Sequence, residues 1–457
     1  MKKLLAVTAL LLSASLAACG GCGAAQETAA PEAPQADAPA AEARQSDTPA
    51  AEAPQEEAAD EGGTVTVWCW DPALNVYSME EAAKVYKEIN PGFEIEIIET
   101  PWETVQTGII TAATANLHDT LPDIFLCQDT AFQRNVVSYP EIFTDLTNSG
   151  INFDEFAPAK VEYSVIDGKN YGVPFDNGTV INCLRTDILE EAGYTVNDFT
   201  GITWDRFIEL GIDVLEKTGK PLLSSIAQEP DLLMIMLQSA GAGLFNADGS
   251  VNIVNNAELR EVMRVLTELV NSSVCIEVNS RDEYIATFVN STVAGTINGC
   301  RILGAVQTAE DQSGNWAVTN IPKLNTPNAA HNSNNGGSSW AVTASSANPG
   351  IAVDFLANTF AGSVEFYETI LPAEGALAAF LPAGASSAYK QPHAFFNGQT
   401  IYSDVTSFAS LAPSSITGVY YNEARDAVGA AMREIVDGAD IDTALRQAED
   451  AVISAMD

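Results

Sequence analysis

The sequence has few basic residues and few of the residues that commonly hold metals. It contains 21 lysines and arginines against 61 aspartates and glutamates, so its formal net charge is −40, and it has only three histidines. A chain this acidic, without a basic cluster, repels nucleic acid phosphates and anionic lipid headgroups. We therefore expect no nucleic acid partner. Because His118, His331 and His393 are far apart in polar sequence, we also expect no metal ion and no other cofactor.

Cysteines are few and widely spaced as well. Cys19 and Cys22 lie near the N-terminus, and the rest of the chain contains five more, which are Cys69, Cys127, Cys183, Cys275 and Cys300. An odd number without paired spacing does not indicate a disulfide framework. Most of the five stand among apolar residues, which is typical of small buried thiols.

Motifs that carry catalysis are missing too. The chain has no G-x-S-x-G elbow, no phosphate-binding loop, no H-E-x-x-H pair and no complete calcium-binding loop. Carboxylate pairs are plentiful in an acidic chain and do not by themselves indicate glycosidase chemistry. We expect that the protein is not an enzyme.

The N-terminus has the layout of a signal peptide. Met1 to Lys3 is a basic start, residues 4–18 are apolar and small, and Cys19 follows a Leu-Ala-Ala sequence. This ending resembles the lipobox of bacterial lipoproteins, in which the cysteine carries lipid after cleavage. The resemblance implies a signal peptide over 1–18 and an anchor on Cys19 at the extracytoplasmic face of the cell membrane. Two alternatives are Cys22 as the lipid acceptor and an ordinary secreted protein.

Residues 19–63 are predicted to be a disordered acidic tether. They are almost wholly Ala, Pro, Glu, Gln, Gly and Asp, with no aromatic residue and no branched aliphatic residue. Such a segment cannot bury enough apolar surface to offset the entropy of ordering. Scattered prolines and like charges keep it extended.

Order is predicted to begin at Thr64. Residues 64–68 alternate as a strand does, a capping box at 78–81 opens a helix, and 93–97 alternate again. A second helix is expected over 101–116 and a third strand over 122–126. Strand, helix, strand, helix, strand indicates a parallel sheet. The roughly 390 residues after the tether suit two lobes better than one core.

Later elements are mostly helical. Amphipathic or buried helices are predicted near 204–217, 230–240, 256–271, 349–361, 364–371, 421–437 and 441–456. Short strands are predicted near 294–298, 315–321 and 338–343. We read Trp204 and Trp316 as core residues.

Seven landmarks, none specific alone, occur in an order that resembles a known family. They are Val65–Trp68, Leu121–Ile124, Asp167–Pro174, Arg185–Leu189, Ile202–Trp204, Gly295–Gly299 and Gly336–Val342. The chain is similar to the extracellular solute-binding proteins of ABC importers, in the branch that includes maltodextrin-binding protein.

The resemblance implies an α/β fold of the type II periplasmic binding protein kind, with two hinge-connected lobes and a helix-rich second lobe. It places residues 64–173 in lobe 1, with 294–322 returning to it. Lobe 2 would hold 174–293, completed by 323–457. Crossings between the lobes are expected near 171–175, 293–297 and 321–327.

Candidate ligand-binding residues follow the predicted strands. Trp70 and Asp71 leave the end of the first strand, where ligands of open α/β sheets bind, and they offer a ring face and a carboxylate to a sugar. Asp129 follows the third strand, and Phe175-Asp176-Asn177 follows the proposed hinge. Capping and turn roles are the alternatives for Asp129 and for the Asp176 turn.

Four further candidates come from the second half of the chain. Glu229 resembles the carboxylate of a ligand-contacting Glu-Pro pair, or caps a helix start. Arg301 stands where relatives often have a stacking Trp, which puts ring stacking there in doubt. Trp340 follows two glycines, and Tyr421 falls where the maltodextrin protein stacks a Trp.

The resemblance implies that the protein captures a carbohydrate, expected to be an oligosaccharide, and delivers it to the transmembrane permease subunits of an ABC importer. We expect it to act as a monomer. A receptor for a cationic solute such as a polyamine is one alternative, favoured by several carboxylates around a narrow slot without an exposed ring. A secreted glycosidase is the other, favoured by facing carboxylates.

Overall fold

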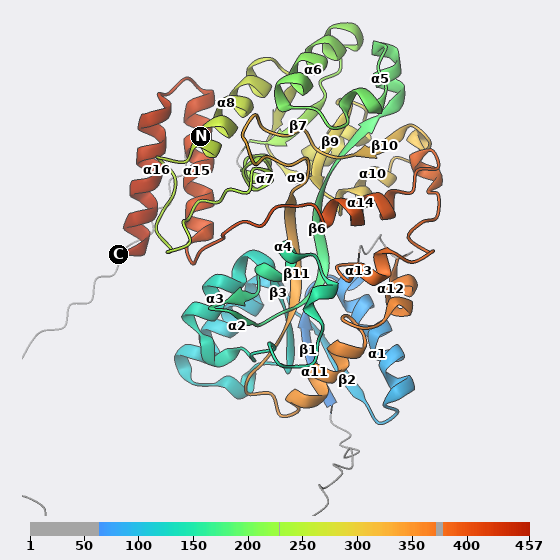
Figure 1. The fold of residues 1–457 in the computed structure, drawn as a ribbon, viewed down its shortest axis with the longest axis vertical. Coiled ribbons are helices and arrows are strands. Elements are labelled where there is room, and N and C mark those ends of the chain that lie inside the picture. Colours follow the sequence, from blue (N-terminus) through green and yellow to red (C-terminus); the bar gives the residue numbers. More distant parts are fainter. Residues whose placement is uncertain (1–63, 228, 372–377) are drawn as a thin grey trace, which may run out of the picture. The chain divides into compact units, whose positions relative to one another are not determined.

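The computed structural model describes residues 64–227, 229–371 and 378–457 (Figure 1). The predicted signal peptide, Cys19 and the predicted tether lie outside the described residues. Within that part, no helix is long and apolar enough to cross a membrane.

The predicted alternation at the start of the ordered chain is confirmed. Its elements are β1 (Thr64–Cys69), α1 (Tyr77–Ile89), β2 (Glu94–Glu99), α2 (Trp102–Ala115) and β3 (Ile124–Gln128). β1 pairs in parallel with both β2 and β3, as the two helical crossovers require. Alternate residues of β1 are fully buried, so its inward face is apolar and drives the packing of α1.

The helices and strands that were predicted for the later part of the chain are confirmed within a few residues, but several others, including the long strand over 173–185, were not predicted. The strands are β4 (Val165–Ile166), β5 (Lys169–Asn170), β6 (Val173–Arg185), β7 (Leu223–Ile226), β8 (Cys275–Val278), β9 (Gly295–Gly299), β10 (Trp316–Thr319) and β11 (Asn334–Val342). The helices are α3 (Phe132–Ser138), α4 (Pro158–Glu162), α5 (Thr186–Ala192), α6 (Trp204–Thr218), α7 (Asp231–Ser239), α8 (Ala257–Asn271), α9 (Arg281–Val289), α10 (Ile302–Gln307), α11 (Pro349–Asn358), α12 (Val364–Ile370), α13 (Leu381–Gly384), α14 (Ile401–Ala409), α15 (Tyr421–Val436) and α16 (Ile441–Met456).

Two long strands connect two α/β lobes (Figure 1). The main sheet runs in the order β10-β6-β11-β3-β1-β2, and β9 also pairs with β6. The first lobe holds β1, β2 and β3, covered by α1, α2, α3, α11 and α12. The second lobe holds β7 to β10 and is rich in helices, including α5 to α8, α15 and α16 (Figure 1). Every residue of β6 is buried as it passes from one lobe to the other.

The lobes divide the chain differently from the sequence prediction. Residues 294–322 were expected in lobe 1, but β9 and β10 pair with residues 180–185 of β6 in the second lobe. Residues 338–342 of β11 pair with β3, so this strand and α11 and α12 belong to the first lobe. The reason is that strand partners, which sequence periodicity does not reveal, decide lobe membership.

The crossings move accordingly. The chain crosses in β6, crosses back in β11 at about residues 334–338, and crosses again between α13 and the short helix Ala394–Phe396. After the last crossing the chain contacts the second lobe, where the Gly314 N–H donates to the Phe395 carbonyl. The expected crossings near 293–297 and 321–327 are therefore wrong, since both segments lie within the second lobe.

Between the lobes, the backbones of the crossing strands come into direct contact. A Cβ atom on Gly178 of β6 would lie 2.5 Å from the Gly336 carbonyl oxygen, and one on Gly299 of β9 would lie 2.6 Å from the Asn335 carbonyl oxygen. Only glycine permits this approach. This close approach brings β6, β9 and β11 together between the lobes. The polar groups of β11 then lie at the base of the region between the lobes.

Candidate functional site

A cavity of about 890 Å³ lies between the two lobes. Six segments line it: the residues after β1, the first half of β6, the start of α7, the start of α9, the stretch from the end of β9 through α10, and the start of β11. Five of the sequence-predicted site residues meet here, which are Trp70, Asp71, Asp176, Asn177 and Arg301.

The residues after β1 are held by a cap at a short π-helix, Pro72–Val76. Asp71 accepts hydrogen bonds from the backbone N–H groups of Ala73 and Leu74, at 3.1 and 3.3 Å. The Asn75 side-chain oxygen accepts from the N–H groups of both Trp70 and Asp71. The turn therefore fixes the backbone from which the partly exposed Trp70 ring lines the cavity.

Arg301 reaches across the cavity from the second lobe to the first. Its Nη2 atom donates to Asp71 Oδ2 at 3.1 Å, and its Nη1 atom lies 3.8 Å from Asp176 Oδ2. The Arg301 side chain remains 47% exposed, so guanidinium donors stay accessible beside these pairs. One cation thus contacts carboxylates from β1 and from the crossing strand β6.

Asp176 lines the cavity, and its two oxygens differ in their hydrogen-bond partners. Its Oδ1 atom accepts from both the N–H and the hydroxyl of Ser338, whereas Oδ2 is buried and accepts no hydrogen bond in the described residues. Asn177 is anchored through its side-chain N–H, which donates to the Ala378 carbonyl at 2.9 Å. A buried acceptor without a donor is costly, so Asp176 Oδ2 is suited to a hydroxyl donor.

Sequence reasoning missed a set of amides on the floor of the cavity. The Asn335 side chain donates to Asn298 Oδ1 at 3.1 Å and to Asp231 Oδ2 at 3.3 Å. Asp231 also accepts from Arg425 at 2.7 Å, and Asn298 donates to the Tyr284 hydroxyl. The only sequence signal was the run of asparagines before Gly336, which by itself reads as a loop.

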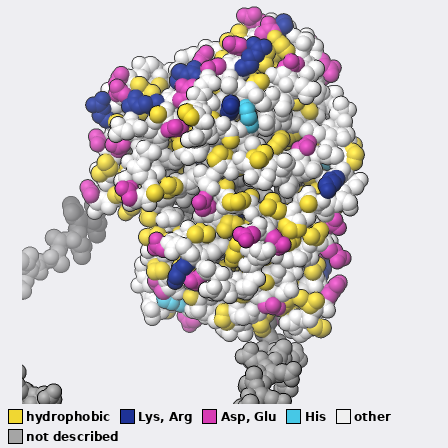
Figure 2. All heavy atoms as spheres, in the orientation of Figure 1, with side chains coloured by type: hydrophobic (Ala, Val, Ile, Leu, Met, Phe, Trp, Pro, Cys, Tyr) yellow, Lys and Arg dark blue, Asp and Glu magenta, His cyan; other side chains and the backbone are white. Residues whose placement is uncertain are grey.

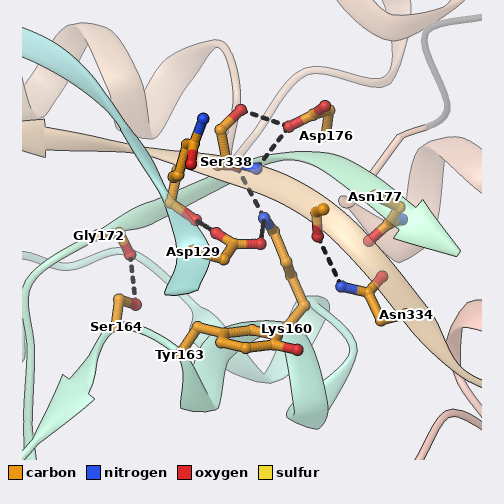
Figure 3. Close-up of polar contacts among 12 residues, drawn as sticks. Asp129, Lys160, Tyr163, Ser164, Gly172, Asp176, Asn177, Asn334 and Ser338 are labelled. Atoms are coloured by element: carbon orange, nitrogen blue, oxygen red, sulfur yellow. Dashed lines mark hydrogen bonds and ion pairs between the residues drawn. The ribbon is translucent and has the colours of Figure 1, made fainter. Parts of the chain in front are cut away.

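Asp129 does not line the cavity, and its carboxylate pairs with the buried Lys160 instead (Figure 3). It is 1% exposed, with Lys160 Nζ 2.5 Å from one oxygen and the Ser339 hydroxyl donating to the other. Burial raises the pKa of Asp129 to about 6, and Lys160 opposes that rise. Lys160 also donates to the Ser338 carbonyl. A Cβ atom on Gly337 would lie 2.5 Å from the Asp129 carboxylate, so this ion pair supports the backbone that faces the cavity.

Besides Asp129, four predicted site residues do not line the cavity, which corrects the prediction: Phe175, Trp340, Glu229 and Tyr421. Phe175 and Trp340 are 1% and 0% exposed, and their rings pack together at 5.3 Å in the core of the first lobe. Strand alternation explains this, because Phe175 points away from the face on which Asp176 lies. Glu229 is exposed beside a small pocket of about 20 Å³ within the second lobe, and Asp231, two residues later, lines the cavity instead.

Tyr421 lies next to the main cavity but does not line it. It borders a narrow pocket of about 30 Å³ that shares Asn335 and Gly336 with the main cavity. It also borders a second cavity of about 300 Å³ on the far side of that pocket. Burial raises the pKa of Tyr421 to about 12, so its hydroxyl stays protonated at neutral pH.

Comparison with known proteins shows the family of this chain. Residues 81–397 match the family of bacterial extracellular solute-binding proteins. A lactose-binding protein of Rhizobium radiobacter is 39% identical over 388 residues, which are 85% of this chain and 92% of that protein. The chain belongs to this family.

Solved structures show the same type II fold in this solute-binding protein. The sugar-binding protein MalE from Xanthomonas citri matches with a TM-score of 0.74 and 16% identity, over 86% of this chain and 98% of that one. The ABC transporter associated binding protein of B. animalis subsp. lactis Bl-04, solved with β-1,6-galactobiose, matches with a TM-score of 0.64 and 21% identity, over 86% and 97%.

The remaining chemistry of this solute-binding protein is that of buried, unreactive groups. The five cysteines in the described residues are free and buried, and burial raises the pKa of each thiol, to about 12 for Cys69 and Cys300.

In the described residues, no group of three or more His, Cys, Asp or Glu side chains is arranged to hold a metal ion. Basic side chains on the face shown in Figure 2 lie singly or in small groups beside acidic ones.

Proposed function

We propose that this solute-binding protein captures a carbohydrate, an oligosaccharide, in the cavity between its lobes and delivers it to the permease subunits of an ABC importer. The observation that carries the proposal is the meeting of Trp70, Asp71, Asp176 and Arg301 in one cavity. A sugar ring has an apolar C–H face that packs on an aromatic ring, and hydroxyls that need both donors and acceptors. The 39% identity to a lactose-binding protein supports the same class of ligand.

The pairing of charges favours a neutral polyol over a cation. The alternative, a polyamine, needs carboxylates free to bind ammonium groups and no exposed ring. Here Asp71 is paired with Arg301 and Asp231 with Arg425, while Trp70 is partly exposed. Asp176 lies near the same guanidinium. Each of the three carboxylates that line the cavity thus lies near a guanidinium. Arg281 also lines the cavity and adds a positive charge, which disfavours a polyamine.

The proposed mechanism is closure of the lobes around the solute. Trp70 and Asp71 belong to the first lobe, Arg301 belongs to the second, and Asp176 lies on a crossing strand. A ligand that contacts all of them binds the closed form more tightly than the open form and shifts the population toward it. We propose that the closed, loaded monomer docks on the permease, and that lipid on Cys19 keeps it at the membrane.

A ligand screen tests this proposal. The full-length protein is heated with lactose, β-1,6-galactobiose, maltose, arabinobiose or spermidine, because binding to the native state raises the melting temperature. We expect at least one saccharide to raise it and spermidine to leave it unchanged. A rise with spermidine alone contradicts the proposal. Asp176→Ala serves as the matched variant and should abolish the response.

A further inference from the structure

A buried lysine connects the interior of the first lobe to the strand that borders the cavity. Lys160 of α4 is 4% exposed and is not among the residues that line the cavity. Its Nζ atom lies 2.5 Å from Asp129 Oδ2 and donates to the Ser338 carbonyl at 2.8 Å (Figure 3). A buried ion pair is often no more stabilising than apolar side chains of similar volume, so stability is a weak reason for this one.

Ser338 links Lys160 to the cavity carboxylate Asp176. Its N–H and its hydroxyl both donate to Asp176 Oδ1, at 2.7 and 2.5 Å, while its carbonyl accepts from Lys160. The next residue, Ser339, donates its hydroxyl to Asp129 Oδ1 at 2.9 Å. Two consecutive residues of β11 are therefore held by charged side chains, with the cavity carboxylate on one side and the buried ion pair on the other.

The backbone of β11 is irregular at this point. Its pairing with β6 shifts register between Asn334 and Gly337 and again between Ser338 and Ser339. Gly336 and Gly337 have φ of +90° and +104°, so the residues just before Ser338 leave regular strand geometry. Where a ladder of strand hydrogen bonds is interrupted, side-chain contacts determine where the backbone groups lie.

The two carboxylates on either side of Ser338 also interact through their charges. Burial raises the pKa of Asp129, Lys160 lowers it, and the negative charge of Asp176 raises it further. Without Lys160, the two carboxylates would repel each other uncompensated, and the Ser338 carbonyl would lose its charged donor. We expect both effects to move Asp176 relative to Arg301, with which it lines the cavity.

Resting on the proposed function, we propose that Lys160 is a positioning residue for solute binding. Together with Asp129 it fixes the backbone of Ser338, and Ser338 holds the Asp176 carboxylate in the orientation that accepts a solute hydroxyl. The affinity for the saccharide then depends on an ion pair that does not touch the saccharide.

Titration calorimetry of the full-length protein with lactose, β-1,6-galactobiose, maltose and arabinobiose tests this role. The method measures the dissociation constant separately from the fraction of protein that binds. Lys160→Met should weaken each saccharide that binds the wild-type protein by at least about tenfold, the scale of one hydrogen bond to a charged group. The control is Phe93→Ala in the core of the same lobe, which should lower the melting temperature but leave the dissociation constant unchanged.

A double variant distinguishes positioning from stability. Lys160→Met combined with Asp129→Leu replaces the ion pair by apolar side chains of similar size, so no buried charge is left unpaired. The melting temperature should recover relative to Lys160→Met alone, whereas the affinity should stay low because the Ser338 carbonyl still lacks its donor. Recovery of the affinity together with the melting temperature overturns the proposal, as does an unchanged dissociation constant in Lys160→Met.

Ser338→Ala provides the test if the Lys160 variants do not fold. It keeps the ion pair and removes one donor to Asp176, so the affinity should fall by at least about threefold. Ser333→Ala is the matched control, because the buried Ser333 hydroxyl donates to the Ile235 carbonyl instead. Equal affinity of these two variants overturns the proposal and leaves the proposed function intact. Failure of every saccharide to bind the wild-type protein overturns both.

Discussion

Two aspartates near the interlobe cavity have the same side chain but different hydrogen-bond partners. Asp176 and Asp129 are both almost fully buried carboxylates near β11. Asp129 has each of its oxygens paired by Lys160 or Ser339, so it supports the backbone, whereas one oxygen of Asp176 accepts no hydrogen bond. Burial alone therefore does not distinguish a structural carboxylate from one that we propose to bind ligand. The hydrogen-bond partners of each oxygen do.

Arg301 gives a prediction at this scale. Arg301→Met should weaken saccharide binding by about 1.5–3 kcal/mol, because hydrogen bonds from a charged donor are lost. It should scarcely change the free energy of unfolding, since the half-exposed pair with Asp71 is worth little. Calorimetry and urea unfolding measure the two effects. The control is Arg206→Met, which removes a similarly exposed arginine paired with Glu209 on the far α6 helix; equal effects of the two variants would contradict the assignment.

Lys160 gives a second prediction, on stability. Lys160→Met should destabilise the fold by about 3–5 kcal/mol at pH 8, because it leaves the Asp129 carboxylate buried without its cation. Lys169→Met is the control, since Lys169 makes only an exposed pair with Asp145.

The pH dependence of that loss has a definite sign. Lys160 lowers the pKa of Asp129, which is about 6 in the wild-type fold, so the variant keeps Asp129 protonated to higher pH. Asp129 binds a proton alike in the two unfolded chains. The loss of stability of the variant relative to wild type therefore grows as pH rises above about 6 and shrinks below it, by up to about 1.4 kcal/mol per pH unit. Urea unfolding at pH 5 and pH 8 measures the difference. An equal deficit at both would show that Asp129 does not titrate as described.

At the scale of elements, β11 is the strand on which the site depends. It crosses between the lobes, contributes Asn335 to the cavity floor, and makes irregular pairs with β6 at Asn334–Gly337 and at Ser338–Ser339. Gly337 has φ of +104°, and its absent Cβ leaves room for the Asp129–Lys160 pair.

Gly337→Ala tests the strand directly. It should lower the melting temperature by several degrees, because alanine is strained at this φ and its Cβ collides with the Asp129 carboxylate. Thermal unfolding measures it. The control is Gly350→Ala in the first turn of α11, where a Cβ meets nothing within 4 Å. If Gly337→Ala were as stable as this control, β11 would be able to move away from the Asp129 carboxylate without loss of stability.

Element boundaries were largely predictable from sequence, and lobe membership was not. β1 alternates and α8 has a clear apolar face, so local periodicity fixed both. The position of β9 depends on pairing with a strand more than a hundred residues away, for which no local pattern exists. Among site residues, Trp70 and Asp71 followed from the strand end, whereas Asn298 and Asn335 are amides that act only once the fold brings them together.

The whole molecule holds its lobes together through ion pairs as well as strands. Arg134 of α3 pairs with Glu423 of α15 at 2.9 Å, and Arg301 pairs with Asp71 across the main cavity. Both pairs are partly exposed, so salt screens them and each contributes at most about 1 kcal/mol.

Arg134→Gln should therefore shift the ligand-free protein modestly toward the open form. We expect a larger radius of gyration in small-angle scattering at low salt, and a smaller difference from wild type at 1 M salt. Arg446→Gln on α16 is the control, because Arg446 donates to a backbone carbonyl of its own helix and makes no ion pair between the lobes in the described residues. A difference from wild type that is unchanged by salt would contradict an electrostatic latch.

The membrane anchor is tested on the whole chain in its host. Cys19→Ala should release the protein from the membrane fraction into the medium, because it removes the thiol that is proposed to carry the lipid. Immunoblotting of membrane and medium measures it, with Cys22→Ala as the matched control. Retention of the Cys19 variant, with release of the Cys22 variant, would move the acceptor to Cys22.

The interleaving of the lobes has a consequence for how the chain matures after synthesis. β3 gains its second partner only with β11, and the second-lobe core includes residues of α15 and α16. A nascent chain that has left the ribosome up to residue 330 therefore has neither lobe complete, and domains fold as units. We therefore expect such a chain to stay unfolded while most of it is being made, which is the condition in which a protein can be threaded through a narrow export channel.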